Sequence, residues 1–224
     1  MGAMAIPGGH GETVHPVAEI VAAVEVARLP VGMSTRVVAI DGHGGSGKSS
    51  LAAVLSGAMS HAPIVHTDDF ASWDNPIEWW PRLLDQVLVP LASGEAARYR
   101  RFDWIEKRLA EWIDLPLHPA VVIVEGVSAS RLEFDPYLAF RIWVETSRAT
   151  CLRRGLERDG EAMRGQWSDW FAEEDAYVAR DDPVGRADLV VSGEPASTMD
   201  PTQVAVLEDR GHISPGQVRP RRSS

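Results

Sequence analysis

The stretch Gly42-His43-Gly44-Gly45-Ser46-Gly47-Lys48-Ser49 decides the fold of this 224-residue chain. An apolar run over residues 36–41 leads into it, and a second apolar run, over residues 50–55, follows it. Apolar residues on consecutive positions are typical of a parallel strand that is covered on both faces. The glycine-rich stretch is therefore expected to turn the chain from a buried strand into a helix.

The spacing G-x-x-x-x-G-K-S in this context predicts a loop that binds the phosphates of a nucleotide. Gly42 and Gly47 give the backbone the freedom to turn successive N–H groups toward phosphate oxygens, and the helix N-terminus adds its positive end. Lys48 would bridge the β- and γ-phosphates, and the Ser49 hydroxyl would bind Mg²⁺. We therefore expect ATP and Mg²⁺ as cofactors. The predicted cofactor-binding residues are Gly42, Gly44, Gly45, Ser46, Gly47, Lys48, Ser49 and Ser50.

Composition excludes several classes of protein. The length suits one α/β domain and is too short for two large ones. A formal net charge of −10 repels a phosphate backbone, so no nucleic-acid partner is expected. Cys151 is the only cysteine, which excludes an internal disulfide and a thiolate metal cluster and fits a reducing cytoplasm. No apolar stretch approaches the roughly 20 residues of a membrane span, so no membrane partner is expected.

The apolar runs predict an α/β fold, with a five-stranded parallel sheet and helices on both faces. Together with the glycine-rich motif, they point to a P-loop NTPase three-layer fold. The expected strands cover residues 36–41, 63–67, 121–124, 140–144 and 187–191. The expected helices cover residues 12–29, 48–60, 77–92 and 105–113, and a further helix begins after Ser147 as its cap.

We expect one domain over residues 1–193, whose active site is completed by two segments. A substrate-binding insertion is predicted over residues 71–119, and a lid over residues 153–180. Beyond residue 193 the periodicity fades, which predicts a flexible tail over residues 194–224. Five of the eight tryptophans fall in the insertion, where they either stack on a planar substrate or pack in the core: Trp73, Trp79, Trp80, Trp104 and Trp112.

Carboxylates follow two of the expected strands, at the sheet edge where ligands bind in open parallel sheets. Asp68 comes after the strand at residues 63–67 and could accept the proton of an attacking hydroxyl. Glu125 ends the strand at residues 121–124 and could bind Mg²⁺ directly or through water. The alternative is that Asp68 caps a turn and that Glu125 is an unrelated terminal residue.

Arginines in the predicted lid are candidates for stabilising the charge that develops on the transferred phosphate. Arg154, Arg158 and Arg164 lie where a closing segment would bring guanidinium groups to the phosphates. Of these, Arg154 and Arg158 are predicted to be catalytic, together with Lys48 and Asp68. Solvated surface arginines are the alternative interpretation.

In this order, these motifs resemble the uridine kinase-like group of P-loop small-molecule kinases, which includes relatives of phosphoribulokinase and pantothenate kinase. The resemblance runs from about residue 37 to residue 191. His66-Thr67-Asp68-Asp69-Phe70 is similar to the family's D-[SD]-F-Y segment, whose first Asp is the catalytic base, and this implies that role for Asp68. Ala71 stands where the family usually has an aromatic residue.

Further segments extend the resemblance to the acceptor and to the lid. Arg101-Phe102-Asp103-Trp104 is similar to the Y-D-F segment that helps to hold the nucleoside, which implies substrate contacts for Phe102, Asp103 and Trp104. Residues 124–127 resemble the E-G-I segment, and residues 152–159 resemble the R-R-x-x-R-D run that opens the lid helix. The histidine usual beyond Y-D-F is absent. Because the sequence departs from the family pattern at two positions on the acceptor side, the resemblance supports phosphoryl transfer better than it supports uridine as the acceptor.

The sequence thus predicts an ATP-dependent kinase that transfers the γ-phosphate to a hydroxyl of a small molecule, preferably a nucleoside or a related sugar-containing compound. Two alternatives stay open: a phosphotransferase for an antibiotic or specialised metabolite, and an ATP-binding switch module without an acceptor. Homo-oligomerisation is also left open. The missing N-K-x-D segment argues against a GTPase.

Overall fold

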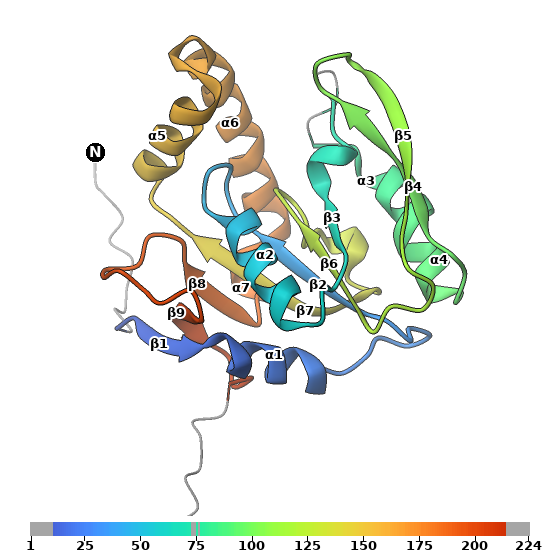
Figure 1. Cartoon of the computed structure of the whole chain (residues 1–224). Coiled ribbons are helices and arrows are strands. Elements are labelled where there is room, and N and C mark those ends of the chain that lie inside the picture. The colour runs from blue at the N-terminus through green and yellow to red at the C-terminus, as the bar shows by residue number, and fades with distance from the viewer. Residues whose placement is uncertain (1–10, 73–74, 76, 214–224) are drawn as a thin grey trace, which may run out of the picture.

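A seven-stranded sheet forms the centre of the molecule (Figure 1). The computed structural model describes residues 11–72, 75 and 77–213. The strands lie in the order β1-β9-β8-β7-β2-β6-β3. Their bounds are β1 Thr13–Pro16, β2 Arg36–Asp41, β3 Ile64–His66, β6 Val121–Glu125, β7 Leu138–Glu145, β8 Leu189–Ser192 and β9 Gln203–Asp209. The five strands from β8 to β3 pair in parallel, as predicted, whereas β9 pairs antiparallel with β8 and with β1.

Alternate residues of β2 show how the sheet is covered on both faces. Val38 and Ile40 belong to one apolar cluster, which helices α1 (Val17–Val26) and α2 (Lys48–Ala58) complete. Val37 and Ala39 belong to a second cluster, on the other face. Because successive side chains of a strand point to opposite faces, a run without polar interruption must be buried on both. This confirms the predicted layer arrangement.

The second face is covered by the segment that was predicted as an insertion. Three consecutive helical pieces, α3 (Trp80–Leu83), a π-helix (Leu84–Leu88) and α4 (Val89–Ala92), occupy the helix predicted over residues 77–92. The helix predicted over residues 105–113 is wrong, because β4 (Arg98–Asp103) and β5 (Arg108–Asp114) form an antiparallel hairpin there. The Asp103 carboxylate accepts the N–H groups of residues 105 and 106 and so fixes a turn.

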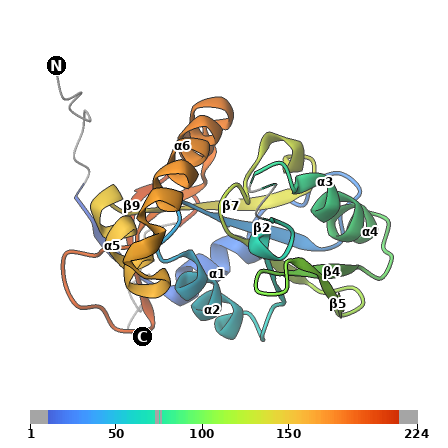
Figure 2. The same cartoon turned by 90° about the horizontal axis from the view of Figure 1, so that it is seen from above.

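Helices α5 (Arg148–Asp159) and α6 (Arg164–Asp181) contain the predicted lid residues. A single 3-10 turn, Glu161–Met163, joins them, and the Ser147 hydroxyl caps α5 as predicted by accepting the N–H of Thr150. The two helices project on one side of the loop between β2 and α2, and the β4–β5 hairpin projects on the other (Figure 1). Figure 2 shows the same separation from above.

The edge of the sheet lies where the sequence predicted a tail. β9 falls within residues 194–224, and its Val204, Ala205 and Val206 are buried, so the flexible tail is wrong for this strand. The strand contains a run of four apolar residues, and periodicity alone cannot distinguish a buried strand from a buried helix segment in so short a run. Residues 214–224 of the predicted tail lie outside the described residues.

β9 also changes the start of the chain. The helix predicted over residues 12–29 is shorter than expected, because Thr13–Pro16 pairs with β9 as β1 and the helix begins at Val17. Within the described ranges, none of the helices combines the length and apolar character that crossing a membrane requires.

Candidate active site

The loop between β2 and α2 is built by its glycines. Gly42, Gly45 and Gly47 have φ angles of +148°, +79° and +105°. A Cβ on Gly42 would lie 2.6 Å from the carbonyl oxygen of Val144, and one on Gly45 would lie 2.5 Å from that of Cys151. The loop is therefore open only to glycine at these points. Gly47 caps α2 without a side chain, so the first N–H groups of the helix face the loop.

Lys48 closes the loop from within. Its side chain is buried, and Nζ donates to the carbonyl oxygen of His43 at 2.8 Å. Burial next to the loop puts the ammonium beside the N–H groups that would hold phosphate. The predicted position of Lys48 at a phosphate site agrees with this geometry.

Ser49 and Glu125, the two predicted metal ligands, lie together. The Ser49 hydroxyl is 3.3 Å from both carboxylate oxygens of Glu125, which is buried at the end of β6. His66 Nδ1 lies 2.5 Å from Glu125 Oε1, and this hydrogen bond is the main cause of a raised His66 pKa. Hydroxyl and carboxylate oxygens are the ligand types that Mg²⁺ prefers, so these side chains fit that ion.

Asp68 lies in a 3-10 turn, Thr67–Asp69, directly after β3. The residue is exposed toward the cavity that it lines, and partial desolvation by the surrounding protein raises its pKa, while the positive charges of Lys48 and Arg158 act in the opposite direction. The Asp68 carbonyl oxygen accepts a hydrogen bond from Trp104 Nε1 at 3.0 Å. The turn thus holds a carboxylate with an elevated proton affinity next to the phosphate loop.

One cavity of about 680 Å³ brings these groups together. It is bounded by the phosphate loop, the ends of β3 and β6, the insertion, and helices α5 and α6. The predicted site residues among its lining are Gly44, Gly45, Gly47, Lys48, Ser49, Ser50, Asp68, Trp104, Glu125, Arg154 and Arg158.

The three lid arginines have different environments. Arg154 donates to the carbonyl oxygens of Gly45 and Ser46, each at 3.3 Å, and therefore braces the loop as well as lining the cavity. Arg158 also lines the cavity and pairs with Asp159 at 2.7 Å. Arg164 pairs with Glu161 and is not among the residues that line this cavity, so the structure does not bring it together with the other two arginines, and its place at the phosphates stays a prediction.

Only one of the three predicted substrate-contact residues of the insertion lines the cavity. Trp104 lines the cavity, whereas Phe102 and Asp103 do not belong to the described lining residues. Phe102 packs against the Trp104 ring, with the ring centroids 5.5 Å apart, and Asp103 builds the hairpin turn. Of the other tryptophans, Trp79 is buried in the core and Trp73 lies outside the described residues.

Helix α6 supplies contacts that the sequence did not predict. The buried Glu174 carboxylate accepts the Gly44 N–H at 3.1 Å and pairs with His43 Nδ1 at 2.9 Å. Trp167 packs against Gly155, where an added Cβ would lie 2.2 Å from the Trp167 ring. A glycine inside a helical pattern often marks a close approach, so Gly155 carried a signal for this contact. Glu174 carried none.

The other end of α6 is fixed to the loop after β6. Tyr177 donates its hydroxyl to Asp41 Oδ2 at 2.6 Å, and Asp41 also accepts the N–H groups of Gly42, Ser128 and Ser130. Asp41 thereby ties Gly42, the segment after Glu125 and helix α6 to one buried carboxylate. Tyr177 has a strongly raised pKa, because burial and the Asp41 charge both disfavour its ionised form.

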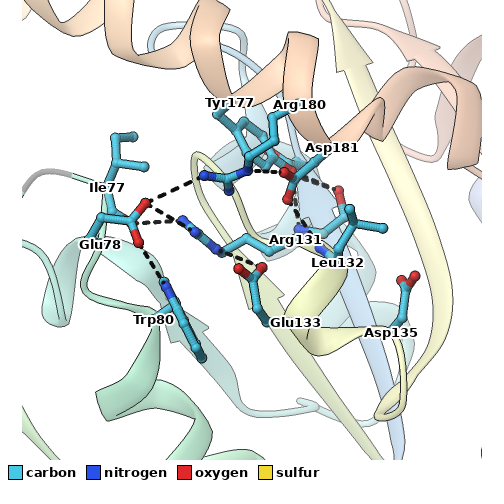
Figure 3. Close-up of polar contacts among 12 residues, drawn as sticks. Ile77, Glu78, Trp80, Arg131, Leu132, Glu133, Asp135, Tyr177, Arg180 and Asp181 are labelled. Carbon is cyan, nitrogen blue, oxygen red and sulfur yellow. Dashed lines mark hydrogen bonds and ion pairs between the residues drawn. The ribbon is translucent and has the colours of Figure 1, made fainter.

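A second polar cluster joins α6 to the insertion (Figure 3). Arg131 is fully buried and donates to the Ile77 carbonyl oxygen at 2.8 Å and to Glu78 Oε1 at 3.3 Å. Glu78 is also 3.6 Å from Arg180 of α6, whose neighbour Asp181 accepts the N–H of residue 132. Since Ile77 lines the cavity, this cluster connects a cavity wall to the C-terminal end of α6.

Comparison with known proteins shows that solved structures share this fold. No family model matches the sequence, and no curated protein matches it. A solved structure described as a possible uridine kinase from Bacillus stearothermophilus matches with a TM-score of 0.57 and 19% identity, over 78% of this chain and 96% of its own. A second, provisionally assigned as a fructose transport system kinase from Silicibacter sp. TM1040, matches with a TM-score of 0.53 and 22% identity, over 76% and 91%.

The chain has the P-loop NTPase fold. Both neighbours carry kinase descriptions, so the resemblance to uridine kinase-like P-loop kinases, carried first by the motifs, extends to the three-dimensional structure. Identities of 19% and 22% establish the shared fold alone. Activity has to be argued from the site.

Proposed function

We propose that this protein is an ATP-dependent kinase that transfers the γ-phosphate to a hydroxyl of a small molecule. The observation that carries the proposal is the cavity in which Asp68 faces the phosphate loop, Lys48 and the Ser49–Glu125 pair. Phosphoryl transfer needs a phosphate cradle, a metal site, a group to orient the hydroxyl and cations over the phosphate, and the cavity contains a candidate for each. The kinase descriptions of two structures with this fold agree with it.

The residues have separate tasks in this proposal. The loop N–H groups and Lys48 bind the triphosphate, and Ser49 and Glu125 would hold Mg²⁺, which when bound neutralises phosphate charge. Asp68 orients the acceptor hydroxyl and takes its proton. The guanidinium groups of Arg154 and Arg158 stabilise charge on the transferred group.

The acceptor is best supported as an uncharged compound with an apolar or planar part. The described residues that the insertion contributes to the cavity are Ala71, Ile77 and Trp104, and none of these carries a charge. A phosphorylated or carboxylated acceptor would lack a cationic partner on this wall. A nucleoside or a related sugar-containing compound fits, because its base can lie against an indole and its sugar hydroxyl can reach Asp68.

The test is ADP release by the purified chain with ATP and Mg²⁺, measured with nucleosides, free sugars and hydroxyl-bearing antibiotics as separate acceptors. Release that depends on a nucleoside supports the proposal in full, and dependence on another hydroxyl compound moves the acceptor class to specialised metabolites. Release that no acceptor stimulates would contradict a kinase and favour a nucleotide-binding switch.

The two lysines of the chain provide a matched pair for this assay. Lys48→Met removes the ammonium at the loop and is expected to abolish acceptor-dependent ADP release. Lys107→Met makes the same chemical change in the β4–β5 turn, away from the described cavity lining, and is expected to retain release. Equal losses in both variants would mean that Lys48 has no special part in the reaction.

A further inference from the structure

An acidic side chain of the lid helix occupies part of the phosphate loop. Glu174 accepts the Gly44 N–H at 3.1 Å and contacts His43 Nδ1 at 2.9 Å, and its side chain is only 6% exposed. Loop N–H groups of this kind are an anion site. In this structure one of them is satisfied by a carboxylate of the same chain.

Packing fixes Glu174 in this position. Trp167 lies seven residues earlier on α6, two helical turns away and hence on the same face. Its ring atoms Cζ3 and Cη2 are 3.0 and 3.2 Å from the position that a Cβ on Gly44 would take. Trp167 is buried, and its Nε1 donates to Asp159 at 3.1 Å. The contact between α6 and Gly44 is therefore a packed interface, in which Glu174 is one member.

The partner of Glu174 is also held from several sides. The His43 ring lies edge-on to Trp143, with 5.5 Å between the ring centroids, and the His43 carbonyl oxygen accepts from Lys48. Lys48 is thus tied to the same residue whose ring contacts Glu174. A change at Glu174 would therefore affect both the Gly44 N–H, which it accepts, and the Lys48 ammonium, which is linked to it through His43.

A carboxylate and a phosphate oxygen compete for such a site, because both are anionic acceptors and one N–H cannot serve both fully. Placing a phosphate beside an unreleased carboxylate would also bring like charges together in a partly desolvated cavity. We propose that Glu174 takes the place of a phosphate oxygen at Gly44 in the unliganded protein and lowers the affinity of the site for nucleoside triphosphate until it is displaced. This rests on the nucleotide site of the proposed function.

The test compares binding of a non-hydrolysable ATP analogue with Mg²⁺ to the wild type and to three variants by calorimetry. Glu174→Gln keeps the size of the side chain and an acceptor for Gly44 but removes the charge, and Glu174→Ala removes both. Both are expected to bind the analogue about tenfold more tightly than the wild type, the effect of one charged hydrogen bond. Asp169→Asn, the same loss of charge at an exposed position of α6, is the control and is expected to change affinity less than about twofold.

The outcomes separate the two proposals. No binding of the analogue to any of the chains would remove the nucleotide site and with it the proposed function. If the wild type binds the analogue and both Glu174 variants bind it with equal or lower affinity, the role proposed for Glu174 is overturned and the kinase proposal stays intact. A crystal structure of the wild-type chain with the analogue gives a readout that needs no variant: a Glu174 carboxylate still bonded to the Gly44 N–H would equally overturn it.

Discussion

Asp68 is the residue on which the proposed chemistry depends most directly. Its carboxylate faces the cavity, while Asp69, the next residue, instead accepts the Tyr99 hydroxyl at 3.0 Å and is not among the cavity-lining residues. Adjacent aspartates therefore have separate environments: Asp68 lies where the proposed reaction needs an acceptor for the hydroxyl proton, and Asp69 takes part in the packing of the β4–β5 hairpin.

Replacing Asp68 by Asn is expected to reduce turnover by about two orders of magnitude or more, because the amide cannot take the proton of the acceptor. Nucleotide affinity should stay near the wild-type value, since the loop and Lys48 are unchanged. Single-turnover ADP formation and analogue binding measure the two quantities. Asp69→Asn is the control and should keep most of the activity. Asp68→Asn turnover equal to that of the wild type would exclude Asp68 from the mechanism.

The raised pKa of Asp68 predicts the shape of the pH profile. Desolvation moves this pKa above its ordinary value of 3.8, and only the ionised carboxylate can accept a proton. Activity should therefore be full above the raised pKa and fall as the pH decreases through it, at a higher pH than an ordinary aspartate would give. The dependence of kcat/KM on pH measures this acid limb. A profile that stays flat down to the ordinary aspartate range would contradict the assignment.

At the scale of elements, helix α6 is held at both ends by different chemistry. Trp167 and Glu174 contact the phosphate loop, whereas Tyr177 bonds to the buried Asp41 at the end of β2 and Asp181 accepts the N–H of Leu132 in the segment after β6. The lower end is part of the core network around Asp41, and the upper end lies on the proposed nucleotide site. This division makes the upper contacts the ones that a ligand can replace.

The Tyr177 hydroxyl offers a test of the lower anchor. Tyr177→Phe leaves the ring but removes the hydrogen bond to the buried Asp41, which should lower the free energy of unfolding by about 1–3 kcal/mol. For a chain of this size that corresponds to a fall in Tm of roughly 2–4 °C per kcal/mol. Tyr137→Phe is the matched control, because the Tyr137 hydroxyl makes no hydrogen bond within the described ranges. Thermal unfolding of both variants measures the difference. A Tm of Tyr177→Phe equal to that of Tyr137→Phe would show that the hydrogen bond to Asp41 adds nothing to stability.

The sequence predicted the elements whose evidence is local. Consecutive apolar residues identify β2 and β6, and the glycine spacing places Lys48 and Ser49. The proximity of Ser49 to Glu125 and the position of Asp68 then follow from strand ends in a parallel sheet. The β4–β5 hairpin was missed, because its turn depends on one Asp103 side chain rather than on a glycine signal. Glu174 could not be predicted, since its role exists only once α6 has packed on Gly44.

At the scale of the whole molecule, the sheet extends beyond its parallel part. β9 closes the edge at β8 and gives β1 its only described strand partner, so the two ends of the described chain lie side by side at this edge (Figure 1). The cluster that contains Val204, Val206 and Ile213 also contains Ile40 and Val144, which flank the phosphate loop. The support of the candidate active site thus includes residues beyond the predicted domain end at residue 193.

This arrangement predicts that β9 is required for a stable fold. Val206 is 2% exposed, so Val206→Asp would place an unpaired charge in the core and is expected to cost several kcal/mol, about 3 or more. Gln203→Asp introduces the same residue at an exposed position of the same strand and should cost less than about 0.5 kcal/mol. A chain ended after residue 193 would lose the whole strand and expose the edge of β8, and should not show a cooperative unfolding transition. Chemical denaturation of the three chains measures these effects. The prediction is contradicted if Val206→Asp is as stable as Gln203→Asp and the shortened chain unfolds cooperatively. The parallel strands would then be sufficient to fold and to support the phosphate loop without their antiparallel edge.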